Sequence, residues 1–567
     1  MEYQNENRIC QNCKKDFTIE PGDFNFYEKI KVPPPTWCPE CRFQRRYSWR
    51  NEVTLYRRPC DFCGKSSVTI YSPKKPYKVY CPTCWWGDGW DAKNITQDFD
   101  FSQPFFEQFY ELQLKIPRIA LLTKNSVNSE YTNHSGDNKN CYMSVSTFYS
   151  ENVMYSTNIW EKGQDLCNCT LVMKNGVLSY ECTDSFNIYR CQFSILLENC
   201  TDCFYCYDLR NCQNCFLSCN LRNQNYMILN KKYSKEEYNK KIKEFNLSSY
   251  KVGQNLFMVF VDLIKEKALH RFAVMENTVN SFGNMLYNSR NANRVFDSDR
   301  VEDVKYGIIV PDVKNSMDVS HVGFNCELLY ESHALVRSYN VLFSHLSYDN
   351  NDIQYCDSCH NSNNLFGCCG IKNGSYMIFN KKYSKGEYLK LKEKIIEHMK
   401  KTGEYGEFFP SKFSPFKYNE SHAQVYIPLN KEEALKIGFD WEDNLPGTYD
   451  KETVSSENIP DNITNVSDSI TKEILKCENC KKNYNIIPAE FVFYQRENIP
   501  IPHFCYACRY KKRISLRLPR KLWHRTCMCD REGHGHGGKC SNEFETSYAP
   551  DRSEIVYCER CYQQEVY

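Results

Sequence analysis

Pairs of cysteines separated by two residues are the part of this sequence whose type and spacing can do chemistry. Four such pairs lie near the N-terminus: Cys10, Cys13, Cys38, Cys41, Cys60, Cys63, Cys81 and Cys84. Two pairs together supply the four thiolates of a closed, tetrahedral structural zinc site. The spacing therefore predicts two zinc sites in residues 10–84.

The C-terminal end repeats this arrangement. At an offset of 467 residues the first five cysteines recur as Cys477, Cys480, Cys505, Cys508 and Cys527. Other residues recur at the same offset, among them Pro21/Pro488, Tyr27/Tyr494, Arg46/Arg513 and Arg50/Arg517. After an insertion the offset becomes 477, and the last three cysteines recur as Cys540, Cys558 and Cys561. The ends are copies of one module, and the chain predicts about four zinc ions in total.

The insertion, near residues 528–537, leaves the fourth ligand of the last site open. Alignment assigns Cys527, but Cys529, His534 and His536 can also coordinate zinc and compete for the position. Four cysteines would also accept an iron–sulfur cluster, whereas the absence of a βαβ pattern argues against a thioredoxin-like redox pair. Zinc is the preferred interpretation.

The first half of each module resembles a family of zinc-ribbon, treble-clef zinc-binding domains. The resemblance lies in CQNCKKDFTIEPGDFNFYEKIKVPPPTWCPECR and CENCKKNYNIIPAEFVFYQRENIPIPHFCYACR, where an FY pair and a proline separate CxxC from CxxCR. The second copy has Tyr506-Ala507 in place of Pro39-Glu40. The resemblance implies bound zinc and a treble-clef fold at each end. The whole layout also resembles uncharacterised Cys-rich proteins of small-genome uncultivated bacteria, which implies nothing about function.

A twelve-residue period runs through the middle of the chain. This middle part must position the two zinc modules at the ends. In rows of twelve from Leu166, the tenth column reads Asn175, Asn187, Asn199, Asn211 and Asn223. Rows from Ser316 keep the register, and their fifth column reads Ser320, Ser332, Ser344, Cys356 and Cys368. Such a period predicts repeated units stacked on one another. Asn suits a left-handed turn and an amide ladder. One unit or two could make each turn.

The fold class is therefore multidomain and mainly β. We expect two parallel β-solenoid, β-helix-like blocks with helical caps, flanked by the zinc modules. Capping boxes at Ser234–Glu237 and Ser384–Glu387 predict the capping helices. The expected parts are a double zinc module at 1–92, a helical connector at 93–139, solenoid blocks at 140–232 and 280–382, helical caps at 233–279 and 383–402, a linker at 403–470 and a second double zinc module at 471–567.

Composition limits the classes of function. The formal net charge is +2, so no overall field demands an anionic partner. No apolar run approaches about 18 residues, so no membrane partner is expected. The first residues lack an apolar signal core, which predicts a cytoplasmic protein. In that compartment 33 cysteines indicate metal sites and buried thiols, whereas export would allow bridges between the central ones.

Basic and aromatic residues follow each zinc knuckle and could contact phosphates and bases. The candidates are Arg42, Arg45, Arg46, Arg50, Arg509, Lys512, Arg513 and Arg517. They favour a non-catalytic zinc-binding scaffold whose partner is nucleic acid, a ribonucleoprotein or a protein. The alternatives are a carbohydrate-active enzyme of the β-helix type and an adhesive rod. His321, His333 and His345 fall twelve apart; a solvent-exposed row is preferred to a metal site.

Overall fold

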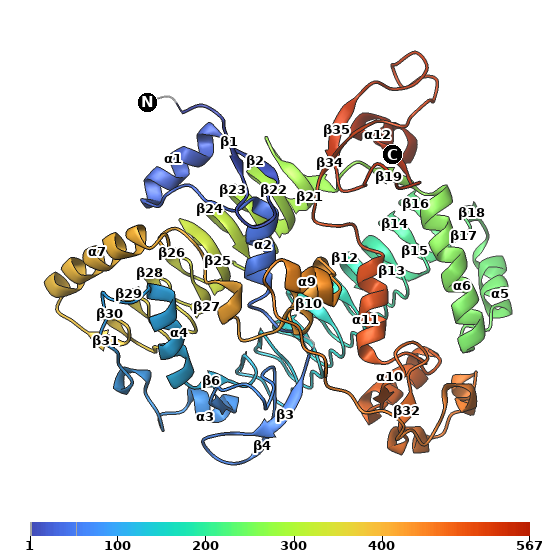
Figure 1. The fold of residues 1–567 in the computed structure, drawn as a ribbon. Helices are drawn as coiled ribbons and strands as arrows, with labels where there is room; N and C mark the ends of the chain where they lie inside the picture. Colours follow the sequence, from blue (N-terminus) through green and yellow to red (C-terminus); the bar gives the residue numbers. More distant parts are fainter. Residues whose placement is uncertain (1–2, 53) are drawn as a thin grey trace.

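The computed structural model describes residues 3–52 and 54–567. Two large, mostly parallel sheets form its body, and each end of the chain forms two small hairpin units that lie apart from one another (Figure 1). The first sheet contains β9 (Val145–Thr147), β10 (Thr157–Trp160), β11 (Thr170–Met173), β12 (Thr183–Tyr189), β13 (Ile195–Phe204), β14 (Tyr207–Arg210), β15 (Gln213–Phe216), β16 (Cys219–Arg222), β17 (Asn225–Ile228) and β18 (Lys231–Lys232). The protein is thus multidomain and mainly β.

The second sheet follows after a helical segment. It contains β20 (Met275–Glu276), β21 (Phe282–Tyr287), β22 (Arg290–Asp299), β23 (Val301–Ile308), β24 (Val313–Ser320), β25 (Leu329–Val336), β26 (Tyr339–Leu342), β27 (His345–Tyr348), β28 (Asn351–Gln354), β29 (Asn363–Phe366), β30 (Ser375–Ile378) and β31 (Lys381–Lys382). Parallel pairing starts before the predicted rows in both sheets, since Val145 already pairs with Thr157 and Met275 with Leu286.

The strand register shows that one repeat unit, not two, separates stacked strands. Thr183 pairs with Ile195, Ile195 with Tyr207 and Tyr207 with Cys219, a step of twelve residues each time. A second column of strands repeats this step from Thr201 to Gln213. Each twelve-residue unit therefore advances the chain by one rung.

The first predicted row of each set departs from this step. Thr170 pairs with Thr183 and Ser320 with His333, a step of thirteen residues. The expectation of rows without an insertion is therefore wrong at these two places. The extra residue is taken up by two consecutive left-handed residues, Lys174–Asn175 and Phe324–Asn325.

Left-handed residues recur every third position along the rungs. Asn199, Asp202, Tyr205, Asp208 and Asn211 all have φ between 52° and 55°. A unit therefore turns at four positions rather than at the two tight turns that a pair of strands would need. The predicted left-handed conformation of the Asn column is confirmed, although bulky residues adopt it too.

The column of asparagines forms the expected ladder of amides. The Nδ2 atom of Asn187 donates to Oδ1 of Asn199 at 2.8 Å, and Asn199 and Asn211 donate to the next rung at 3.1 Å. The ladder is exposed to solvent. Inside the rungs, small side chains at the fifth column fill the narrow interior, and thiols such as Cys203 donate to a backbone oxygen of their own rung, that of Thr201, at 3.4 Å.

We expect Asn211→Leu to lower the free energy of unfolding by about 1–2 kcal/mol. The change removes two ladder bonds, each worth about 0.5–1.5 kcal/mol, although solvent can replace part of them. Leu also fits the left-handed conformation less well than Asn. Urea unfolding measures the effect. The control is Asn364→Leu, because the amide of this half-buried side chain bonds to the neighbouring Asn363 and not to the next rung. Equal losses from both variants would contradict a stabilising ladder.

Helices close the ends of the sheets as predicted. α5 (Lys235–Glu244) begins at Ser234 and α7 (Lys385–Lys401) at Ser384, each with the expected capping box. They pack against β17 and β30, the last parallel strands of their sheets. Helix α4 (Phe105–Lys115) lies within the segment 93–139, where a helical connector is expected. The remaining helices of eight or more residues in the described chain are α1 (Pro21–Ile30), α2 (Pro39–Tyr47), α6 (Tyr250–Asp262), α10 (Pro488–Glu497), α11 (Tyr506–Ser515) and α12 (Glu559–Val566).

Residues 403–470 differ from the expected linker. The segment contains the short helix α9 (Lys431–Lys436). The segment nevertheless packs against the body, since Phe408 and Phe409 are at most 1% exposed in the core of the second sheet. Its polar composition concealed a few well-spaced aromatic residues that bury the segment. In the described residues, no helix has the length and apolar character needed to cross a membrane.

A helix from each end of the chain packs on one of the two large sheets. Helix α2 of the N-terminal module packs on β24 and β25 of the second sheet. Helix α11 of the C-terminal module lies beside the first sheet, where Arg513 contacts Glu181 (Figure 1). The N-terminal helix α2 therefore packs on the second sheet, and the C-terminal helix α11 packs on the first. Each helix contacts the sheet that is farther from it in the sequence.

Candidate metal centres and their docking on the sheets

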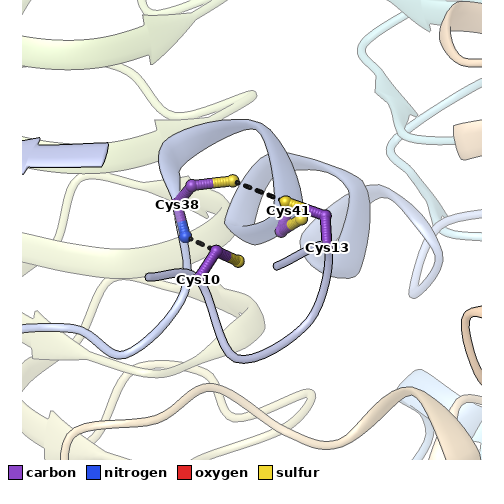
Figure 2. Close-up of side chains that lie close together, drawn as sticks. All are labelled: Cys10, Cys13, Cys38 and Cys41. Atoms are coloured by element: carbon purple, nitrogen blue, oxygen red, sulfur yellow. Dashed lines mark hydrogen bonds between the residues drawn. The ribbon is translucent and has the colours of Figure 1, made fainter. Parts of the chain in front are cut away.

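The first cysteine group is built by a hairpin and a helix N-terminus. The turn after β1 (Glu6–Ile9) carries Cys10 and Cys13, and β2 (Asp16–Ile19) completes the hairpin. Cys38 caps α2, and Cys41 lies in its first turn. The four sulfur atoms lie within 4.8 Å of one another and converge on one point (Figure 2). This donor set fits a tetrahedral metal ion.

Backbone hydrogen bonds favour the thiolate form of Cys10, whereas a hydrogen bond with Cys41 and burial raise the pKa of Cys38. The amide of Cys38 donates to the sulfur of Cys10 at 3.2 Å, and the side chain of Asn12 donates to Cys41 at 3.3 Å. Burial alone would raise the pKa of Cys10, but bonds from the backbone of Cys38, Cys13 and Asn12 lower it to about 7. Because metals bind thiolates, these bonds prepare the group for an ion.

Three further groups repeat the same construction. They are Cys60, Cys63, Cys81 and Cys84; Cys477, Cys480, Cys505 and Cys508; and Cys527, Cys540, Cys558 and Cys561. In each, the second pair starts a helix whose first cysteine amide donates to the first sulfur at 3.2 Å. All sixteen predicted cysteines thus fall into four groups, and Cys527 takes the place that alignment gave it.

The arginines after the first knuckle are buried rather than offered to a partner. Arg42 and Arg46 are each 1% exposed. Arg42 bonds to Asp318 at 2.7 Å, and Arg46 bonds to Glu331 at 3.0 Å. Arg45 bonds to Glu331 at 3.1 Å. Burial alone would raise the pKa of Glu331, but these guanidinium groups lower it, so the carboxylate remains charged.

The second knuckle repeats the pattern on the first sheet. Arg509 pairs with Glu490 at 3.1 Å, and Arg513 with Glu181 at 3.0 Å. Arg517 pairs with Asp184 of the first sheet at 2.9 Å and with Asp297 of the second at 2.6 Å. The remaining two candidates are Arg50, paired with Glu52, and Lys512, which lies 3.6 Å from the ring centroid of Phe257.

The expectation that these side chains form an exposed nucleic-acid surface is therefore wrong. Helices α2 and α11 dock on the sheets. Carboxylates from the rungs neutralise Arg42, Arg45, Arg46, Arg513 and Arg517, whereas Arg50 and Arg509 pair with Glu52 and Glu490 of their own modules. One signal in the sequence could have revealed the partners. Arg46 pairs with Glu331, and Arg513 pairs with Glu181. The two arginines are related by the 467-residue offset of the end modules, and the two glutamates by the 150-residue offset of the two sets of rows. The same pairing removes Asp318 and Glu331 as the free carboxylates that a glycosidase would need.

A cavity of about 980 Å³ lies where the first sheet, residues 403–470 and the C-terminal module meet. Its lining residues in the described chain include no aspartate or glutamate. They include five tyrosines and four basic residues, Tyr142, Tyr155, Tyr426, Tyr484, Tyr506, Lys482, Arg509, Lys511 and Arg517. In the same described part, Lys482 and Lys511 line the cavity and form no ion pair, and Nζ of Lys482 donates to the backbone oxygen of Pro446 at 2.8 Å.

The histidine row is buried, which corrects the expectation of a solvent-exposed one. His333 is 0% exposed and His345 is 2% exposed. The rings of His321 and His333 stack with centroids 5.5 Å apart, and the ring of Tyr47 covers His333 at 5.3 Å. Nδ1 of His333 bonds to the backbone oxygen of Arg46. The row thus forms part of the surface on which α2 docks.

Stability should fall as the pH is lowered from about 6.5 towards 5. Burial lowers the pKa of His422 to about 4 and that of His360 to about 3, so both stay neutral in the folded protein. The unfolded chain takes up protons below about 6.5, and each such histidine then costs up to about 1.4 kcal/mol per pH unit. Urea midpoints at pH 7 and pH 5 test this, with His422→Gln expected to reduce the difference. A difference unchanged by His422→Gln would contradict a neutral buried His422.

Comparison with known proteins does not assign the chain to a family. No family model matches the chain, and no curated protein matches it. A solved structure described as a "putative acetyltransferase from Desulfovibrio desulfuricans G20" is aligned with 47% of this chain and 71% of its own, at 8% identity and a TM-score of 0.10. A similarity at that level carries no argument about the fold or the activity of this protein.

Proposed function

We propose that this protein is a non-catalytic, zinc-stabilised scaffold that binds single-stranded nucleic acid in the cavity beside its C-terminal module. The single observation that carries the proposal is that cavity, lined by tyrosines and unpaired lysines without a carboxylate. Tyrosine rings stack on bases of any sequence, and lysines attract the phosphates between them. A volume of about 980 Å³ lies at the upper end of the range of small-molecule pockets and has room for a few nucleotides.

The metal in the four cysteine groups is proposed to be zinc. Four cysteine sulfurs at one point suit zinc better than the oxygen-preferring ions. The hairpin knuckle followed by a helix N-terminus supports the treble-clef interpretation. The twelve-residue rungs support the interpretation of each sheet as a parallel β-solenoid. In this proposal the zinc modules fasten the two solenoids to one another and form one wall of the binding cavity.

All four cysteine groups should fill with zinc, giving at least about four ions per purified chain. Elemental analysis of the purified protein measures this number. Removing the ions with a chelator at neutral pH should unfold both end modules, because such small modules obtain their stability from the metal. Two ions or fewer, or the visible absorption of an iron cluster, would contradict this assignment.

Binding is tested with a fluorescent single-stranded RNA and the full-length, nuclease-treated protein. We expect Lys482→Glu with Lys511→Glu to weaken binding at least about tenfold at moderate salt, since both lysines line the cavity. The matched control is Lys235→Glu with Lys240→Glu on the exposed face of α5, with little expected change. An equal effect of both double variants, or no binding by the unmodified protein, would overturn the proposal.

A further inference from the structure

We propose that the C-terminal module holds two metal ions that share the thiolate of Cys561. One ion is bound by the four cysteines Cys527, Cys540, Cys558 and Cys561. The second is bound by Cys529, His534, His536 and the same Cys561. The chain would then carry one ion more than its four cysteine groups provide, in a Cys2His2 site that fits zinc.

The ligand atoms of the second group already converge. They all lie within 4.8 Å of one another. The sulfur of Cys529 is 3.2 Å from Nδ1 of His534, and the sulfur of Cys561 is 3.5 Å from Nε2 of His536. Cys529 and Cys561 are 0% exposed and His534 is 8% exposed. Four donors meeting at a nearly closed point are the arrangement of a structural zinc site.

The outer nitrogen of each histidine has its own acceptor. Nε2 of His534 lies 3.2 Å from Oε1 of Glu565, and Nδ1 of His536 lies 2.7 Å from the backbone oxygen of Gly538. A histidine that binds a metal characteristically donates its other N–H to a carboxylate or a backbone carbonyl. With those hydrogens directed outwards, the lone pairs of Nδ1 in His534 and of Nε2 in His536 point at the cysteine sulfurs. This second observation does not depend on the clustering of the ligands.

The loop that brings these residues together belongs to the C-terminal copy alone. Gly533, Gly535 and Gly538 have φ of 86°, 73° and 70°, a conformation that side chains resist. At Gly535 an added Cβ would lie 1.8 Å from the side chain of Arg560. In the N-terminal copy the inserted loop is absent: only Asp61 and Phe62 lie between Cys60 and Cys63, and neither is a metal-binding cysteine or histidine. The N-terminal module is therefore an internal comparison that lacks the second group.

Sharing one thiolate is chemically reasonable. Cys561 belongs to both groups, and a thiolate sulfur has lone pairs for two metal ions. The two sites then need seven side chains instead of eight. Cys529, His534 and His536, which compete with Cys527 in the sequence for a single position, become ligands of a second ion instead. The ligand field of that ion contains nitrogen, which none of the four-cysteine groups supplies.

The test is zinc content by elemental analysis and native mass spectrometry of the full-length, nuclease-treated protein. We expect about five zinc ions per chain and a loss of one in His534→Ala with His536→Ala. The control, His524→Ala, changes an exposed histidine of β34 (Trp523–Thr526) and should leave the number unchanged. A count of about four in the unmodified protein and in the double variant alike would overturn the proposal.

X-ray absorption at the zinc edge of the unmodified protein gives a second readout that does not require a folded variant. Nitrogen at about 2.0–2.1 Å beside the sulfur shell supports the second site, and a shell of sulfur alone overturns it. If the double variant loses two ions because the loop collapses, this spectrum still decides between the two arrangements. Neither measurement involves nucleic acid, so its outcome is independent of the proposed binding function.

Discussion

Replacing Cys38 by serine should release the ion of the first cysteine group and unfold the N-terminal module around it. A structural zinc ion contributes about 10–16 kcal/mol of apparent binding free energy to such a module. The sequence alone predicts that the rest of the protein would remain folded. The structure extends the effect, because α2 begins at Cys38 and carries the arginines that neutralise Asp318 and Glu331. We therefore expect the second sheet to lose stability as well.

Hydrogen exchange measured by mass spectrometry separates the parts, with zinc content determined on the same sample. Exchange should accelerate in residues 3–52 and in β24 and β25, and much less in the first sheet. The matched control is Cys359→Ser, a buried thiol of the second sheet that belongs to none of the four cysteine groups and donates to backbone oxygens as a hydroxyl can. Unchanged zinc content in Cys38→Ser would contradict the metal site, and unchanged exchange in β24 and β25 would contradict the docking.

Replacing Glu331 by glutamine should lower the free energy of unfolding by about 3–5 kcal/mol. Glu331 is 0% exposed and contacts Arg42, Arg45 and Arg46. Removing its charge leaves the three buried guanidinium groups with two carboxylates instead of three, since Arg42 and Arg46 keep Asp318 and Arg45 keeps Glu407. Breaking a buried ion pair from one side is strongly destabilising. The loss should appear as a lower urea midpoint with the zinc content unchanged.

The control for Glu331→Gln is present in the same chain. Glu181 occupies the equivalent position in the first sheet, but it pairs with Arg513 alone and its side chain is 13% exposed. Glu181→Gln should therefore cost about 1 kcal/mol. Equal losses of stability in the two variants would contradict a stabilising role for the ion pairs of Glu331 with the three arginines.

The cysteine groups could be predicted from the sequence because their geometry is local. A Cys-x-x-Cys turn and a second pair at a helix start position four sulfurs through short-range hydrogen bonds, such as that from Cys38 to Cys10. Duplication of the whole string made the prediction stronger. The twelve-residue step was predictable for a related reason, since identical neighbours such as Asn199 and Asn211 bond to each other in register.

Three features depended on the tertiary structure. The arginines after each knuckle look like a nucleic-acid surface in the sequence, and only the docking of α2 and α11 shows where they point. Arg46 and Glu331 are 285 residues apart, and no local pattern marks one as the partner of the other. The thirteen-residue length of the first rows could not be read from the sequence. The extra residue is accommodated by a second left-handed residue, such as Asn175, and this leaves the composition of the row unchanged.

The sequence by itself determined the donor sets, the number of cysteine groups and the repeated rung, because each rests on contacts between residues close in sequence or equivalent by repetition. The tertiary structure alone decided which surfaces face solvent. It buried the basic residues, placed Lys482 and Lys511 in an open cavity, and brought Cys529, His534 and His536 to Cys561. The physical reason is that burial and charge neutralisation are set by packing between distant segments, and the cost of leaving a charge unpaired in that packing selects its partner.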